Sequence, residues 1–227
     1  MAACYGRSTT SVVAHRRTGA SESAQGGAGP VSRLIVGLGN PGNRYETTPH
    51  NLGFLTLDRL AEQEGIRFGW REAEARVGRG ELGGRAVLLA KPLSYMNRSG
   101  GPVKALLRNH ALEPRDLLVV YDELALPWTQ LRIRERGSAA GHKGVQSIIE
   151  AVGTDEFIRV RMGIQPGHPV SDGAAYVLRP FRRNELEEVA EFTGRAADAV
   201  RLILTEGAAQ AMSVHNRRAP GVDTEEA

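Results

Sequence analysis

Four polar side chains that could perform chemistry lie at the ends of predicted strands or helices. Asn40 follows an apolar run in VGLGNPG, and Asp122 comes just past the strand-like DLLVVY. His50 stands near the start of a predicted helix, and Asn97 lies between a predicted strand and a predicted helix. Ligands of open α/β sheets bind at the carboxyl ends of strands. We therefore expect these four side chains to converge on one site.

The residue types in this set favour acid–base chemistry at a carbonyl group. From residue 33 onward the sequence has no G-x-S-x-G elbow, no H-E-x-x-H motif and no Cys/His metal spacing. A carboxylate beside an imidazole can orient it to remove a proton from water. Asparagine amides can donate to a carbonyl oxygen or orient the water. The set predicts hydrolysis of an activated acyl bond, such as an ester, without a covalent enzyme intermediate.

The glycines of VGLGNPG offer a second interpretation, because Gly37-x-Gly39-x-x-Gly42 matches the dinucleotide fingerprint. That motif requires a helix starting at the turn and an acidic residue about 20 residues further on, at a strand end. Here the helical pattern begins only further along the chain, and Asp58 lies inside it. The pattern favours a turn that displays Asn40, with a dinucleotide-dependent oxidoreductase as the alternative.

Composition indicates an ordinary globular protein of 227 residues, with 41% hydrophobic and 24% charged residues. No apolar stretch approaches the ~20 residues that span a membrane. The only cysteine is Cys4, so an internal disulfide is excluded, and a reducing, cytoplasmic location is expected. The net charge of +3 comes largely from the first 32 residues. Without them 26 basic and 25 acidic residues remain of 29 and 26, so nucleic-acid binding must depend on local clustering.

Alternating strand and helix patterns predict one α/β domain, with a mixed twisted sheet and helices packed on both faces. Residues 1–32 form an expected disordered leader, which is either an organelle-targeting segment or an over-long start. The domain spans 33–212, and 213–227 form a polar C-terminal tail. Thr48 is expected to cap a helix, and Asn184 with Glu187 a second one. The predicted strands are 33–38, 75–82, 85–89, 116–121, 131–136 and 158–164, and the helices are 49–65, 99–111, 142–152 and 184–206.

A cluster of arginines predicts a phosphate site. The run from Leu131 alternates with period two, which places Arg132, Arg134 and Arg136 on one face of a strand. A later predicted strand adds further arginines, Arg159 and Arg161. The alternative is a solvated strand face. A phosphate site would make binding sensitive to salt.

Four segments together resemble the motifs of bacterial-type peptidyl-tRNA hydrolases, in the same order. They are LIVGLGNPGNRYETTPHNLGF, KPLSYMNRSG, LLVVYDELALPWTQLRIRERGSAAGHKGVQSI and FIRVRMGIQPG. The resemblance runs from about residue 33 to residue 207. It implies hydrolysis of the ester that joins a peptide to the 3′ end of tRNA, which recycles tRNA from aborted translation. It also implies a monomeric α/β enzyme that needs neither metal nor cofactor.

The resemblance assigns roles to individual residues. His50 matches the catalytic histidine of the T-x-H-N motif, Asp122 its carboxylate, and Asn40 completes the expected catalytic set. Arg134 and Arg161 match the basic pair that grips the 5′ phosphate of tRNA. The residues expected to bind substrate in the cleft are Tyr45, Asn51, Met96, Asn97, His142 and Lys143.

Three positions depart from the family pattern. Pro49 replaces the more usual arginine before the catalytic histidine, and Tyr121 replaces a frequent histidine before the aspartate. Lys143 stands where the family commonly has asparagine, and an ammonium donates hydrogen bonds but accepts none. Lys143 favours a second alternative, an RNA-binding module that has lost hydrolysis. The residues that argue against this alternative are His50, Asp122, Asn40 and Asn97.

Overall fold

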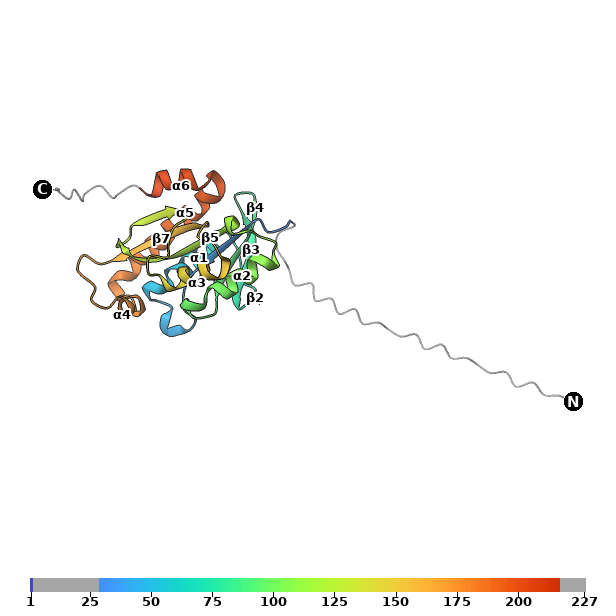
Figure 1. Cartoon of the computed structure of the whole chain (residues 1–227), viewed down its shortest axis with the longest axis horizontal. Coiled ribbons are helices and arrows are strands. Elements are labelled where there is room, and N and C mark those ends of the chain that lie inside the picture. Colours follow the sequence, from blue (N-terminus) through green and yellow to red (C-terminus); the bar gives the residue numbers. More distant parts are fainter. Residues whose placement is uncertain (2–28, 217–227) are drawn as a thin grey trace.

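A computed structural model describes residue 1 and residues 29–216, and these build one seven-stranded sheet (Figure 1). The strand order is β2-β3-β4-β1-β5-β7-β6. β1 pairs in parallel with β4 and β5, and β5 in parallel with β7, whereas the remaining pairs are antiparallel. The sheet is therefore mixed, as predicted. Its strands are β1 (Arg33–Gly37), β2 (Trp70–Glu72), β3 (Ala75–Leu82), β4 (Arg85–Pro92), β5 (Leu117–Pro127), β6 (Leu131–Arg134) and β7 (Ile158–Gln165).

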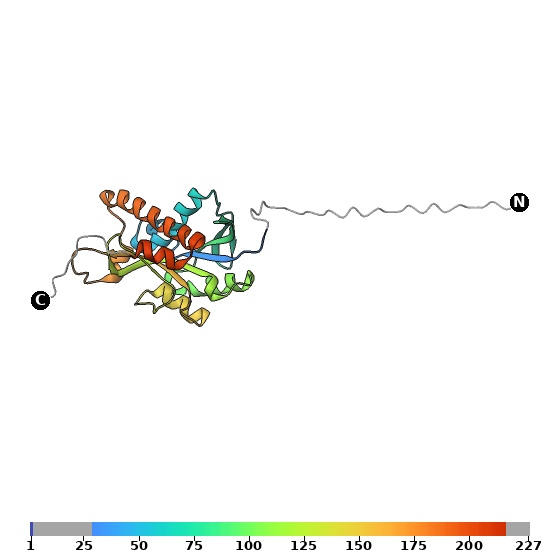
Figure 2. The same ribbon diagram turned by 90° about the horizontal axis from the view of Figure 1, so that it is seen from above.

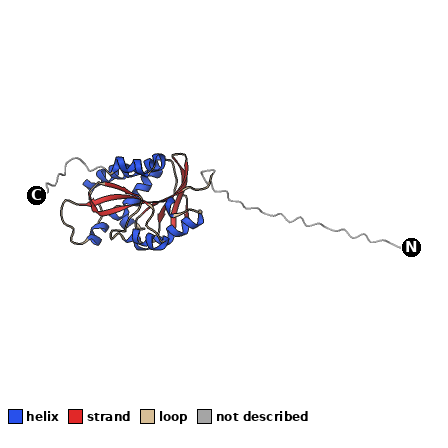
Figure 3. Ribbon diagram, turned by 45° about the horizontal axis from the view of Figure 1, so that its top comes forward, coloured by secondary structure: helices blue, strands red, loops and turns tan. Residues whose placement is uncertain are grey.

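Helices cover both faces of the sheet, which confirms the predicted layers (Figures 2 and 3). On one face α1 and α5 bury a core that includes Leu57, Phe192 and Val200. On the other face α2 and α3 pack together over a second core that includes Leu106 and Ile148. The helices are α1 (Leu52–Gln63), α2 (Gly100–Asn109), α3 (Lys143–Val152), α4 (Gly173–Leu178), α5 (Leu186–Glu206) and α6 (Ala208–His215).

Close packing of α1 on the sheet explains most of the glycines in VGLGNPG. A Cβ at Gly37 would overlap the carbonyl of Gly53 in α1, and a Cβ at Gly39 would overlap the ring of Phe54. Of the three motif glycines only Gly42 has a positive φ, +107°, which suits glycine in a turn. Only a single 3₁₀ turn, Asn43–Tyr45, follows Gly42, and the α-helix α1 begins at Leu52. The structural context that a dinucleotide fingerprint requires is therefore missing.

Two predicted helix caps are wrong. The Thr48 hydroxyl donates to the Tyr45 carbonyl (2.8 Å) instead of capping the helix. Thr48 precedes a 3₁₀ turn, Pro49–Asn51, and α1 begins only after that turn. At the start of α5 a 3₁₀ turn, Arg183–Glu185, intervenes. The Glu185 carboxylate caps this 3₁₀ turn by accepting from the backbone N–H of Arg182 (2.6 Å), and α5 itself has no side-chain cap.

The first described strand, β1, lies in the middle of the sheet, and the last described helix, α6, packs at the β6 edge. Residues 2–28 of the predicted leader and 217–227 of the predicted tail lie outside the described residues, so the domain bounds stay predictions. Within the described part, α6 extends to His215 and brings Asn216 to the outer edge of β6. The Asn216 amide accepts from the Ile133 N–H (2.7 Å) and donates to the Ile133 carbonyl (3.1 Å). None of the described helices is long and apolar enough to cross a membrane.

Candidate active site

Three separate elements bring two histidines and an aspartate together. His50 lies in the 3₁₀ turn before α1, Asp122 lies in β5, and His142 is the residue that caps α3. They meet at the carboxyl-end side of the parallel strands β1 and β5, where ligands of such sheets bind. The expectation that Asp122 lies past its strand is wrong. Pairing of β5 with β7 continues through Glu123, and the register shifts only after it.

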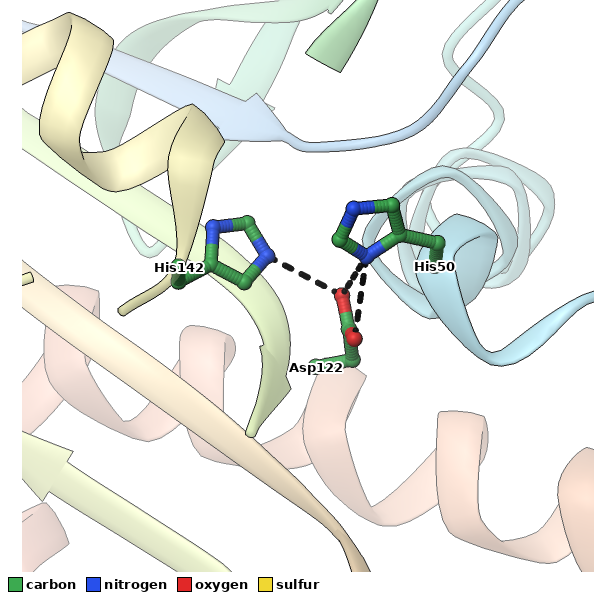
Figure 4. A group of neighbouring side chains, drawn as sticks. All are labelled: His50, Asp122 and His142. Atoms are coloured by element: carbon green, nitrogen blue, oxygen red, sulfur yellow. Dashed lines mark hydrogen bonds and ion pairs between the residues drawn. The ribbon is translucent and has the colours of Figure 1, made fainter. Parts of the chain in front are cut away.

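Asp122 is the centre of this group (Figure 4). Its carboxylate is buried, with 2% of the residue exposed. The Nδ1 atom of His50 lies 2.9 Å from Oδ1 and 3.0 Å from Oδ2. The Nε2 atom of His142 lies 3.1 Å from the same Oδ1. One buried carboxylate therefore receives hydrogen bonds from two imidazoles.

Hydrogen bonding fixes the tautomers of both rings. The Nδ1 atom of His142 accepts from the backbone N–H of Val145 (3.2 Å), so this nitrogen holds a lone pair. The proton of His142 is then on Nε2, which donates to Asp122. His50 faces the same carboxylate with Nδ1, so that nitrogen carries its proton. The Nε2 atom of His50 is left with a free lone pair, as a general base requires.

The pKa of Asp122 lies well below its usual value. Burial raises the pKa of this carboxyl, but the electrostatic attraction to His50 and the hydrogen bonds from His142 and His50 outweigh burial and lower that pKa. Asp122 therefore stays ionised at neutral pH and can hold both imidazoles in place.

This shift predicts how Asp122 responds to acid. Because its folded-state pKa is lower than its unfolded one, its stabilisation is fully present above about pH 4, the ordinary aspartate pKa, and is lost as pH falls toward the folded pKa. We expect the Asp122 carboxyl carbon to keep the chemical shift of a carboxylate below pH 4 in ¹³C NMR of labelled protein. Protonation at the ordinary aspartate pKa would contradict this assignment.

Asn40 is held beside this group by its neighbours. Its Oδ1 accepts from the backbone N–H of Met96 (2.9 Å), so the amide nitrogen remains to donate to a ligand. The Oδ1 atom of Asn51 accepts from the backbone N–H of Asn40 (2.8 Å), and its Nδ2 atom donates to the backbone carbonyl of Asn40 (3.0 Å). Asn51 is buried and is not among the residues that line the cavity next to His50. Its position makes it a support for Asn40.

A cavity of about 580 Å³ opens beside His50 and has two kinds of wall. The lining has a polar part and an apolar part, the apolar wall. The apolar wall comes partly from α4, which the sequence does not predict. The predicted site residues on the cavity are Asn40, Tyr45, His50, Met96, Asn97, Asp122, His142 and Lys143. The apolar residues that sequence reasoning missed are Tyr95, Leu124, Ala174, Val177 and Leu178.

The two predicted phosphate-binding arginines lie outside this cavity lining. Arg161 forms an ion pair with the buried Glu123 (2.9 Å), the acidic neighbour of Asp122. Arg134 is exposed on β6 and donates to the carbonyl of the preceding residue (3.2 Å). The inclusion of Arg159 in a phosphate site is wrong, because Arg159 is buried and only 1% exposed.

The fold and this site define an α/β protein with a His–Asp–His group beside a cavity. The family model of peptidyl-tRNA hydrolase matches residues 34–222. A peptidyl-tRNA hydrolase of Solibacter usitatus is 53% identical over 194 residues, 86% of this chain and 99% of the relative. One of Chloroflexus aurantiacus is 48% identical over 184 residues, 81% of this chain and 98% of the relative. The crystal structure of peptidyl-tRNA hydrolase from Acinetobacter baumannii superposes with a TM-score of 0.76 at 32% identity, covering 86% of this chain and all of that one. The chain belongs to the peptidyl-tRNA hydrolase family and is an enzyme of that family.

Proposed function

We propose that this enzyme hydrolyses the ester bond between a peptide and the 3′ end of tRNA, with water activated by His50. The observation that carries the proposal is the contact of His50 Nδ1 with Asp122 at 2.9 Å, which leaves Nε2 as the basic atom beside the cavity. The function in translation is the release of tRNA from peptidyl-tRNA. The cytoplasmic location and the monomeric state stay predictions.

The reaction needs one proton acceptor and no covalent intermediate. Water gives a proton to Nε2 of His50 while its oxygen bonds to the ester carbonyl carbon. The tetrahedral intermediate then collapses, and the bond between that carbon and the ribose oxygen breaks. His50 returns the proton to the ribose oxygen. The products are a peptide with a free carboxyl group and a tRNA with a free 3′-terminal hydroxyl.

The two histidines have different roles in this mechanism. His142 cannot accept a proton at Nδ1 without losing its hydrogen bond from Val145, which caps α3. Its Nε2 proton is engaged by Asp122. Only His50 has an imidazole nitrogen free for water. His142 therefore holds the carboxylate, and Asp122 stabilises the imidazolium that forms on His50.

The cavity walls suit the two halves of the substrate. The amide nitrogen of Asn40 can donate to the ester or peptide carbonyl oxygen, and Asn97 lies exposed on the same cavity. The ammonium of Lys143 can hold a carbonyl or phosphate oxygen in place of the amide that is usual in the family. The apolar wall can pack against the acyl side chain next to the ester.

One assay tests the function. The full chain is incubated with peptidyl-tRNA, and free tRNA is separated from charged tRNA. Conversion to free tRNA is expected. Binding of peptidyl-tRNA without release would instead support the RNA-binding alternative.

Arg134 and Arg161 are expected to act on the tRNA body and not on the ester. Arg134→Ala and Arg161→Ala should each raise KM for peptidyl-tRNA roughly tenfold, the size of one charge-assisted hydrogen bond. Neither variant should change the rate of hydrolysis of a small substrate, a short oligonucleotide with the peptide esterified to its 3′ end.

Arg161→Ala leaves the buried Glu123 unpaired, so its melting temperature must be measured alongside. Arg85→Ala, at an exposed position of the β3–β4 hairpin, is the matched control. Equal losses of activity on peptidyl-tRNA and on the short ester would contradict a role of these arginines in phosphate binding.

A further inference from the structure

A buried layer behind His142 has no part in the mechanism described so far. Tyr121 precedes Asp122 in β5 and is 1% exposed. Its ring packs against the imidazole of His142, with 4.8 Å between ring centroids and a tilt of 57°. The His50 ring also lies close to His142, with 5.0 Å between ring centroids. His142 thus contacts the rings of both His50 and Tyr121 and the carboxylate of Asp122.

Arg159 is the largest member of this layer. Its guanidinium donates to the carbonyl of Ser138 (2.8 Å) and to the carbonyl of Asp155 (2.8 Å). It also lies over the ring of Phe157, 4.3 Å from the centroid. Its Nε atom has no hydrogen-bond partner among the described residues. Burial of a guanidinium whose hydrogen bonds go only to neutral carbonyl oxygens is unfavourable. These contacts must therefore offset the desolvation penalty of Arg159.

The contact with Ser138 connects Arg159 to the active site. Ser138 belongs to the loop between β6 and α3, where Gly137, Ala140 and Gly141 all have positive φ. In that loop the carbonyl of Ala139 accepts from the backbone N–H of His142 (2.8 Å). An anchor at Ser138 therefore fixes the place where His142 begins α3. It thereby sets the distance from Nε2 of His142 to Asp122.

We propose that Arg159 and Tyr121 are positioning residues of the hydrolysis, which hold His142 as a neutral donor to Asp122. Arg159 fixes the loop, and Tyr121 fixes the imidazole plane. The charged and titratable groups around His142 and Tyr121 are His50, Asp122, Glu123, Arg159 and Arg161. The proposal rests on the function proposed above for His50 and Asp122.

The ionisation of Tyr121 agrees with this role. Burial raises the pKa of its phenol to about 12, although the charges of Arg161 and Arg159 oppose that rise. Tyr121 is therefore a neutral ring at neutral pH.

The test compares Arg159→Met with wild type on peptidyl-tRNA over a range of pH. Methionine keeps an unbranched chain and removes the charge, so no unpaired buried charge remains. We expect kcat to fall roughly tenfold with KM within about twofold, the mark of misplaced catalytic groups. We also expect the acid limb of the kcat profile to move to higher pH. With weaker donation from His142, Asp122 presents more negative charge to His50 and raises the pKa of the base.

Two further variants keep the test decisive. Arg159→Lys retains a charge and one donor nitrogen, so it should give a smaller shift of the acid limb. This variant replaces Arg159→Met in the test if Arg159→Met does not fold. Val200→Ala, in the core on the other face, gives a control with a loss of stability but no contact with this layer. An acid limb unchanged in the arginine variants, with a kcat loss no larger than that of Val200→Ala, would overturn the positioning role. Failure of wild type to release tRNA would instead remove the proposed function itself.

Discussion

Replacing His50 with alanine should lower kcat on peptidyl-tRNA by about 10³-fold, within the range that a general base contributes. Within the group of His50, Asp122 and His142, the variant loses the one imidazole nitrogen left free for water, while Asp122 keeps its hydrogen bond from His142. Binding of tRNA should stay close to wild type, because the predicted phosphate contacts lie outside the cavity lining. Single-turnover release of tRNA measures the first effect, and filter binding of uncharged tRNA measures the second.

A second histidine provides the control for this prediction. His110 also stands at a helix end beside a carboxylate, with its Nε2 3.2 Å from Glu72. It does not line the cavity, so His110→Ala should keep wild-type turnover. Normal release of tRNA by His50→Ala would contradict the assignment of the base.

Asp122→Asn should have the second largest effect, a fall in kcat of roughly 10³-fold with a much smaller change in KM. The asparagine keeps the shape of the carboxylate but offers one oxygen and one NH₂ group. With the NH₂ group toward His50, Nδ1 of His50 must accept, and its proton moves to Nε2, which then cannot take a proton from water. His142 cannot adjust in the same way, because its Nδ1 already accepts from Val145.

The orientation of His50 can be checked separately from its rate. In ¹⁵N NMR the wild-type ring should show its proton on Nδ1, and the Asp122→Asn ring should show it on Nε2. Asp58→Asn, at an exposed carboxylate paired with Lys91 (2.5 Å), is the matched control and should keep full activity. Retention of more than about a tenth of wild-type kcat by Asp122→Asn would conflict with the tautomer argument.

Elements with a strong pattern could be predicted from the sequence, and short ones with a weak pattern could not. The β3–β4 hairpin is recognisable because two strand-like runs flank Gly83 and Gly84, both of which have positive φ. β2 has three residues, none of them buried, and α4 has six with none buried. Neither leaves an apolar period in the sequence. The only local signal for α4 is Asp172, whose side chain accepts from the N–H of Ala175 (3.0 Å).

The sequence was enough to predict that the site residues converge, but not the role of each residue within the site. His50 stands near an element end and Asp122 follows the apolar run LLVVY, which is enough to expect both at one edge of the sheet. Asn51 as a support for Asn40, and Arg159 as a buried anchor, depend on contacts between distant segments. A period of two places Arg159 on a face of its strand but does not say whether a loop covers that face.

Rapid-quench kinetics with enzyme and peptidyl-tRNA tests the central claim most directly, that water activated by His50 attacks the ester without a covalent intermediate. Free tRNA and free peptide are quantified in the same samples, and intact-mass spectrometry examines the protein for a peptide adduct. The mechanism predicts that tRNA and peptide appear at one rate, with no adduct at any time. A burst of tRNA ahead of peptide, together with a protein of increased mass, would contradict it.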